Sequence, residues 1–272
     1  MQGRLVPPAE NRIQCFPRDR WADEFALAAQ AELSCIEWIY DQYGEDVNPL
    51  GTETGIDKIK RLAGQHHVDV VSICADYFMD RPLLRASAEE LEDRMQRLFW
   101  LLQRAVRLDA KRIVLPFVDA SGIRDVEELQ TVAALLRRAL PAAETAGVEL
   151  HLESALNPQQ FATLLAAVPH PLVKVNYDSG NSSSLGYRPD EEFAAYGDRV
   201  GSVHIKDRVL GGGTLPLGRG DVDFPSLFQS LGNVGYAGDF ILQVARAQTG
   251  DEVAWARQNR QWVVKQLLSV SE

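Results

Sequence analysis

Four strand-like runs in the second half of the chain each carry one side chain that can bind a metal ion. The runs are VELHLE, ending at Glu153; LVKVNYD, ending at Asp178; SVHIKD, containing His204; and DFILQV, containing Gln243. Burying an unpaired carboxylate or imidazole in such an apolar run is costly. A divalent ion shared by the four side chains would remove that cost, so the pattern predicts a metal site.

Mixed oxygen and imidazole ligands suit Mn²⁺, Mg²⁺, Co²⁺ or Zn²⁺, and the residue types do not choose among these ions. Such a site supports proton abstraction next to a carbonyl group, because a cation stabilises the negative charge that develops on the oxygen. We expect Glu153 to be the general base, with Lys206 or a metal-bound water supporting the oxyanion. Pairing of Lys206 with a nearby carboxylate is an equal alternative. Gln243 can bind a metal or a substrate, but an amide cannot accept and return a proton.

Eight strand-like segments, rich in Val and Ile, alternate with eight amphipathic segments of helical periodicity. Strands are expected at 1–5, 33–39, 68–74, 111–117, 147–153, 171–177, 200–206 and 239–244. Helices are expected at 20–31, 55–66, 87–108, 125–146, 157–167, 189–197, 223–232 and 250–269. The alternation predicts an α/β fold with a parallel sheet, and the count favours a closed (β/α)8 TIM barrel. An open doubly wound sheet is the alternative, but no GxGxxG follows the first strand.

The chain shows no linker or break in composition, so we expect a single domain over 1–272. Segment 1–5 is short for a barrel strand. It is expected to be a reduced strand, or to begin inside a longer one. Helix ends are marked by a capping box at Ser87 and Glu90, by Asn157 before a proline, by Gly147 as a stop, and by Asp223 as an N-cap.

Further polar groups are expected near the carboxyl ends of the strands, where TIM barrels place their functional residues. Gln14, Glu37 and Asp76 are candidates for binding sugar hydroxyls, and ion pairing is an equal alternative for the two carboxylates. Arg208 and Arg219 lie in the glycine-rich stretch HIKDRVLGGGTLPLGRGDVDF. Glycine amides and arginines suit a phosphate or sugar hydroxyls, so this stretch predicts either a mobile binding loop or a plain connection.

The bulk composition narrows the class of protein. A net charge of −10 over 272 residues, with a pI near 5.1, disfavours an extended nucleic-acid surface. No run has the length of a transmembrane helix, and the N-terminal stretch lacks a signal-peptide core. Three cysteines without a CxxC predict reduced thiols in a cytoplasmic protein. Trp100, Trp255 and Trp262 fit a homodimer surface and equally fit helix packing on the barrel.

Segments along nearly the whole chain resemble the sugar phosphate isomerase/epimerase family with the xylose isomerase-like TIM barrel. They are MQGRL, IEWIYD, ICADYF, ELHLES, VNYDSGN, VHIKDR and LGRGDVDF, and the last four are specific in combination. The group also includes ketose 3-epimerases and endonuclease IV-type enzymes. The resemblance implies a divalent ion held by Glu153, Asp178, His204 and the residue at Gln243, with a ketose or ketose phosphate bound over it.

Two positions depart from the family pattern. Ketose epimerases carry a glutamate on strand eight as a second base, where this chain has Gln243, and they often carry histidine at the position of Asn181, a further candidate substrate-binding residue. Two routes therefore remain. One is a 1,2-isomerisation that uses Glu153 alone; the other is an epimerisation in which Glu37 or Asp76 serves the opposite face.

Three other functions share parts of this pattern. A metal-dependent sugar dehydratase would use the same metal and base but eliminate water. A non-catalytic sugar-binding barrel would keep the pocket, and Gln243 makes that alternative more credible. An endonuclease IV-like nuclease needs more metal ligands and a basic face, which five histidines and an acidic pI disfavour.

Overall fold

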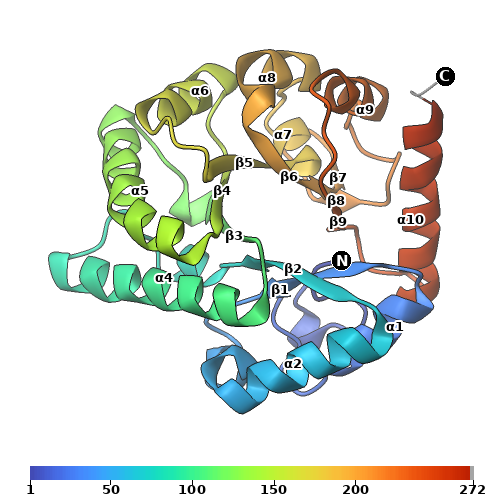
Figure 1. The fold of residues 1–272 in the computed structure, drawn as a ribbon. Helices are drawn as coiled ribbons and strands as arrows, with labels where there is room; N and C mark the ends of the chain where they lie inside the picture. The colour runs from blue at the N-terminus through green and yellow to red at the C-terminus, as the bar shows by residue number, and fades with distance from the viewer. Residues whose placement is uncertain (270–272) are drawn as a thin grey trace.

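Parallel strands curl around a central axis, and helices cover them on the outside (Figure 1). The computed structural model describes residues 1–269. The strands lie in the order β1-β2-β3-β4-β5-β6-β9, and every neighbouring pair is parallel. They span Cys35–Ile39 (β1), Asp69–Cys74 (β2), Arg112–Phe117 (β3), Glu149–Ser154 (β4), Val173–Asp178 (β5), Val200–Ile205 (β6) and Phe240–Leu242 (β9). The predicted TIM barrel is confirmed.

The outer helices follow the predicted positions closely. They span Asp23–Gln30 (α1), Glu53–His66 (α2), Ala88–Leu108 (α4), Val126–Ala146 (α5), Pro158–Ala167 (α6), Pro189–Tyr196 (α8), Phe224–Asn233 (α9) and Glu252–Ser269 (α10). Shorter elements are α3 (Tyr77–Asp80), α7 (Ser179–Ser184), the antiparallel pair β7 (Asp207–Arg208) and β8 (Thr214–Leu215), and 3-10 turns at Ala9–Asn11, Glu45–Val47, Pro49–Gly51, Asp119–Ser121 and Gly197–Arg199.

The predicted helix-end signals are confirmed. The capping box at α4 is complete, since Ser87 Oγ accepts the Glu90 N–H and the Glu90 carboxylate accepts the Ser87 N–H. Asn157 and Asp223 cap α6 and α9 through side-chain oxygens. Gly147 ends α5 with φ +64°, a conformation that glycine adopts without strain.

The predicted first strand is wrong: residues 1–5 form no regular strand. They still occupy the gap between β1 and β9 (Figure 1), and the Met1 carbonyl accepts a hydrogen bond from the Glu37 N–H at 3.0 Å. Gly3 has φ +50°, and a Cβ there would lie 2.5 Å from Ile39 Cδ1. The left-handed turn at Gly3 breaks the extended conformation that a strand ladder requires.

Side chains take over the pairing that a strand would supply. Arg246 donates to the carbonyl oxygens of Arg4 at 2.9 Å and Val6 at 2.8 Å. The buried Glu24 carboxylate accepts the Leu5 N–H at 3.1 Å and the Val6 N–H at 3.0 Å through the same oxygen. These bonds satisfy backbone groups that would otherwise be buried without partners.

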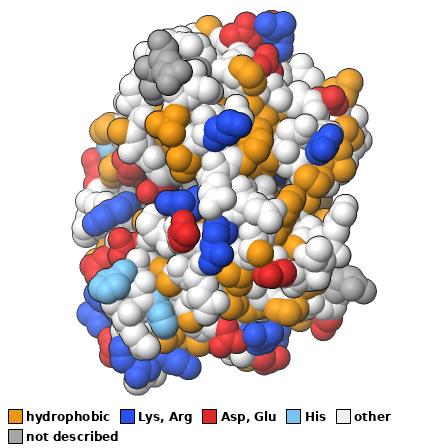
Figure 2. Space-filling model, turned by 90° about the vertical axis from the view of Figure 1, so that its right-hand side faces the viewer, with side chains coloured by type: hydrophobic (Ala, Val, Ile, Leu, Met, Phe, Trp, Pro, Cys, Tyr) orange, Lys and Arg blue, Asp and Glu red, His pale blue; other side chains and the backbone are white. Residues whose placement is uncertain are grey.

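The core forms between the sheet and the helices, and every strand in the sheet contributes apolar residues to it. On the face over α10, hydrophobic, acidic and basic side chains are interspersed (Figure 2). Among residues 1–269 there is no helix long and apolar enough to span a membrane.

Candidate active site

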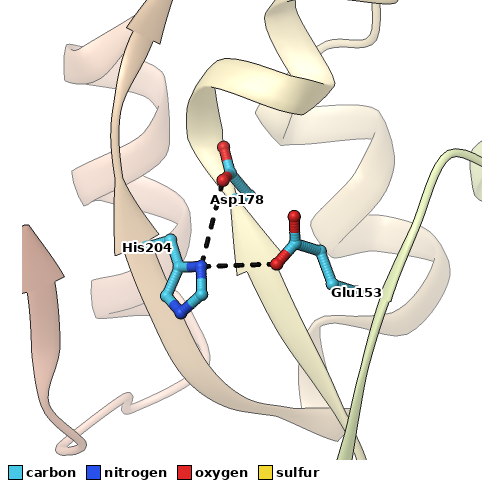
Figure 3. Close-up of side chains that lie close together, drawn as sticks. All are labelled: Glu153, Asp178 and His204. Atoms are coloured by element: carbon cyan, nitrogen blue, oxygen red, sulfur yellow. Dashed lines mark ion pairs between the residues drawn. The ribbon is translucent and has the colours of Figure 1, made fainter. Parts of the chain in front are cut away.

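Three of the four predicted metal ligands meet at the carboxyl ends of neighbouring strands. Glu153 lies on β4, Asp178 ends β5 and His204 lies on β6, and Asp178 pairs directly with His204 in the strand register. His204 Nδ1 lies 3.4 Å from Glu153 Oε2 and 3.9 Å from Asp178 Oδ2 (Figure 3). All three side chains are buried, and one ligand atom from each lies within 4.8 Å of the others.

The opposite edge of the His204 ring faces Glu37. His204 Nε2 lies 2.8 Å from Glu37 Oε1, and Ser72 Oγ donates to Glu37 Oε2 at 2.7 Å. Burial alone would lower the pKa of His204, but the charge of Glu37 and the contacts with Glu153 and Glu37 outweigh it and raise that pKa to about 10. Burial opposes ionisation of Glu37 as well, yet the interaction with His204 brings its pKa down to about 2.

Asn176 contacts two of these three side chains, Glu153 and His204. Its Nδ2 donates to Glu153 Oε2 at 3.2 Å and lies 3.1 Å from His204 Nδ1, while Ser202 Oγ donates to its Oδ1 at 2.6 Å. The Ser202 bond fixes which end of the amide faces the site. Alternation along the strand places Asn176 on the same face as Asp178, but no sequence pattern specified these bonds.

The Lys206 ammonium group lies between three side-chain oxygen atoms beside the group of Glu153, Asp178 and His204. Lys206 Nζ is 3.5 Å from Asp178 Oδ2, 3.5 Å from Asn181 Oδ1 and 3.3 Å from Gln243 Oε1. Asn181 Nδ2 donates to Glu153 Oε1 at 2.6 Å. Gln243, the predicted fourth ligand, thus directs its amide oxygen toward the Lys206 ammonium group, beside Asp178 and Asn181.

A cavity of about 400 Å³ opens above these residues, within the usual range for small-molecule sites. Seven of the predicted site residues line it: Gln14, Asp76, Glu153, Asn181, Lys206, Arg208 and Gln243. Asp178 and His204 lie buried beneath it. The guanidinium of Arg208 bonds to Asn181 Oδ1 at 2.8 Å and to the Gly212 carbonyl, so its donors are directed to the protein.

Two predicted substrate-binding residues lie elsewhere. Glu37 is fully buried behind His204 and is not among the residues that line the cavity. Arg219 is exposed and is likewise absent from that lining within the described part of the chain. The structure therefore does not bring either residue together with Lys206 and Glu153 in the cavity.

The glycine-rich stretch is held in place by Asp207, which sequence reasoning missed. The buried Asp207 carboxylate accepts backbone N–H groups from Gly218 at 2.8 Å, Arg219 at 3.1 Å, Gly220 at 2.9 Å and Val222 at 3.3 Å. These four amides face Asp207 rather than the cavity, so at 218–222 the arrangement favours the plain connection over the binding loop. A buried carboxylate needs such donors, and the turn supplies them.

A series of hydrogen bonds links the N-terminal segment to the cavity wall. Arg4 donates to the carbonyl oxygens of Gln243 and Val244 and to Gln14 Oε1, the last at 2.7 Å. Gln14 Nε2 in turn donates to Asp76 Oδ2 at 2.7 Å. Sequence reasoning missed Arg4, because nothing in segment 1–5 signals that its side chain reaches the backbone just after strand β9.

The donor set fits a divalent ion. Two carboxylates and an imidazole converge with one ligand atom from each within 4.8 Å of the others, and the outer ring nitrogen of the histidine faces a carboxylate, as is usual for metal-binding histidines. The amide oxygen of Gln243 is an acceptable ligand for a hard cation.

The fold and this site define a TIM-barrel protein with a carboxylate–histidine group at the carboxyl ends of its strands. The chain belongs to the xylose isomerase-like TIM barrel family, whose sequence model matches residues 25–266. The resemblance seen in the sequence is thereby confirmed.

The chain is similar to proteins named as sugar epimerases and to a protein solved with zinc. A putative L-ribulose-5-phosphate 3-epimerase, SgbU of Haemophilus influenzae, is 22% identical over 266 residues, covering 91% of each chain. A solved L-ribulose 3-epimerase superposes with a TM-score of 0.73 at 17% identity, covering 93% of this chain and 91% of that one. The IOLI protein, solved with a bound zinc atom, has a TM-score of 0.73 at 17% identity and 91% coverage of both chains. At such identities the structural matches establish the fold.

Proposed function

We propose that this protein is a divalent-metal-dependent isomerase or epimerase of a ketose or ketose phosphate. The observation that carries the proposal is the meeting of Glu153, Asp178 and His204 beneath a cavity that also contains Lys206. The epimerase names of the relatives support the reaction class, and the zinc atom bound by the IOLI protein supports a metal ion in this one.

Glu153, Asp178, His204 and Gln243 would hold the ion, which supplies positive charge near a substrate carbonyl oxygen. Glu153 has a second role. Its two oxygens accept from different amides, Asn176 and Asn181, so the carboxylate is held in one orientation with one edge on the cavity. From there it can remove the proton from the carbon beside the carbonyl.

Lys206 is the cation that stabilises the resulting negative charge. Its ammonium group borders the cavity and keeps only long contacts of 3.3–3.5 Å with protein oxygens. A substrate oxygen can therefore compete for one of its protons. A preorganised donor of this kind acts where charge develops in the transition state.

The proposal is tested by hydrogen exchange. The purified protein with Mn²⁺ is incubated in D₂O with L-ribulose, its 5-phosphate, and further ketopentoses and ketohexoses. We expect carbon-bound deuterium beside the carbonyl of at least one sugar, detected by NMR. Glu153→Gln should abolish the label, whereas Glu127→Gln, an exposed glutamate on α5, should leave it unchanged.

Two results would contradict the proposal. A complete absence of carbon-bound deuterium in every sugar would exclude proton transfer next to a carbonyl. Full exchange in the Glu153→Gln variant would remove Glu153 as the base. A product lighter than its substrate by one water would instead identify a dehydratase.

A further inference from the structure

The Asp76 carboxylate borders the same cavity as Glu153 but reaches it from another part of the barrel. Asp76 follows β2, whereas Glu153 lies on β4, and β3 separates the two strands. Cys74 Sγ donates to Asp76 Oδ1 at 3.2 Å, and Gln14 Nε2 donates to Asp76 Oδ2 at 2.7 Å. The side chain is thus held at a fixed place on the cavity wall.

We propose that Asp76 is the second proton-carrying residue of this site and makes the reaction an epimerisation. The inference rests on the proposed function, because it needs Glu153 to act as the first base. Asp76 supplies the second acid–base group. Gln243 cannot do so, because an amide side chain does not accept and return a proton.

The other carboxylates that line the cavity in residues 1–269 are less suited to this task. Asp41 is committed to the backbone, since its oxygens accept the N–H groups of Phe16 and Gly44, both at 2.7 Å. Asp80 and Asp119 are exposed at the rim, whereas Glu153 lies buried at the floor of the cavity. Asp76 is less exposed than these two, and its carboxylate accepts hydrogen bonds from the neutral side chains of Gln14 and Cys74.

Glu37 is the remaining candidate that the sequence raised, and the structure places it outside the cavity. It lies behind His204, fully buried, with one oxygen on the imidazole and the other on Ser72. A proton held there has no direct path to a substrate above Lys206. Between the two acids left open by the sequence, the geometry therefore favours Asp76.

The surroundings of Asp76 also keep its two protonation states accessible. Burial raises the pKa of Asp76 to about 6, aided by the negative charges of Glu153 and Asp41, while hydrogen bonds from Gln14 and Cys74 oppose the shift. Arg4 is the cation behind Gln14. An acid that must give a proton and take it back works best when its pKa is near the operating pH.

The reaction conserves protons and electrons without a further reactant. Glu153 takes the proton from the carbon beside the carbonyl, and the C–H electron pair moves into an enediolate. Asp76, in its acid form, then donates its proton to the opposite face of the same carbon, and the carbonyl reforms. The product is inverted at that carbon. Glu153 is left protonated and Asp76 ionised, and exchange with water restores both.

Asp76→Asn separates the two proton transfers. In D₂O with Mn²⁺ and the sugar panel above, the wild-type protein should give an inverted product labelled at the inverted carbon. The variant should lose inversion by about 100-fold or more. It should still label the recovered substrate, because Glu153 can return a deuteron to the face it deprotonates. Asp57→Asn, an exposed aspartate on α2, is the matched control and should behave as wild type.

Each outcome decides between the two proposals. Undiminished inversion in a folded Asp76→Asn variant overturns the role of Asp76 and leaves the proposed function standing. Loss of substrate labelling as well as inversion, with thermal unfolding unchanged, also overturns it, because Asp76 would then serve binding or the first step. No label in any sugar with the wild-type protein overturns the proposed function and this inference together. Asp76→Glu, which keeps a carboxylate, should invert the sugar faster than Asp76→Asn and more slowly than the wild-type protein.

Discussion

Glu37 Oε1 and His204 Nε2 lie 2.8 Å apart, and both side chains are completely shielded from solvent. This contact lies on the edge of the imidazole opposite to Nδ1, which faces Glu153 and Asp178. A carboxylate at the outer nitrogen fixes the ring orientation and leaves the inner nitrogen free to bind a metal. Glu37 is thus a positioning residue that acts on the proposed metal site by orienting the His204 ring.

Glu37→Gln should weaken metal binding. An amide carries no charge, so the negative charge that faces Nε2 at 2.8 Å and favours this ring orientation would be lost. We expect the Kd for Mn²⁺, measured by calorimetry on chelator-stripped protein, to rise about 10- to 100-fold. Glu53→Gln, which breaks only exposed pairs with Arg104 and Arg107, is the control. An unchanged Kd in Glu37→Gln would contradict this role.

Gln243→Glu should strengthen metal binding. A carboxylate is a better ligand than an amide for a hard cation, and Lys206 Nζ, 3.3 Å from the amide oxygen, can pair with the added charge. The bond from Gln243 Nε2 to Gln2 Oε1 is lost, but Gln2 can turn its own unpaired Nε2 toward the new carboxylate. We expect a lower Kd for Mn²⁺ at neutral pH. A weaker affinity would show that Gln243 does not face the ion.

Asp207→Asn should loosen the glycine-rich stretch. The carboxylate accepts four backbone N–H groups, and an asparagine side chain offers one acceptor oxygen and a competing donor. We expect a loss of about 2–4 kcal/mol in the free energy of unfolding, measured with urea. New protease cleavage within 209–222 should accompany the loss. Asp221→Asn, which removes one exposed contact to Leu210, should cost under about 1 kcal/mol.

Glu24 should make stability fall as the pH rises. Burial raises the pKa of Glu24 from 4.5 to about 7, with opposing bonds from Val6 and Leu5. Between these values the folded protein holds a proton that the unfolded chain has released, so the free energy of unfolding decreases through that window.

In Glu24→Gln this loss should be smaller by roughly 1–3 kcal/mol between about pH 5 and pH 8. The amide oxygen can still accept both N–H groups, because they share one oxygen in the wild-type protein. Urea unfolding at the two pH values measures the difference. Identical pH dependence in both proteins would show that Glu24 remains ionised when buried.

The alternation of strand-like and helical segments predicted the barrel, and the polar residues at the ends of the apolar strands predicted the buried group of Glu153, Asp178 and His204. Strand side chains point to opposite faces with a period of two, so a carboxylate at the end of an apolar run has to face the barrel interior. Consecutive parallel strands are neighbours, and this brought Asp178 and His204 into direct register. Helix ends were predictable for the same local reason, since caps depend on residues three positions apart.

Contacts between distant segments could not be read in this way. The sequence by itself determined the class of fold, the convergence of Glu153, Asp178 and His204, and the amide at Gln243. Only the tertiary structure decided that side chains replace the first strand, that Glu37 lies behind His204, and that Asp76 borders the cavity. These placements depend on loops and on side-chain directions across the barrel, and neither leaves a periodic signal in the chain.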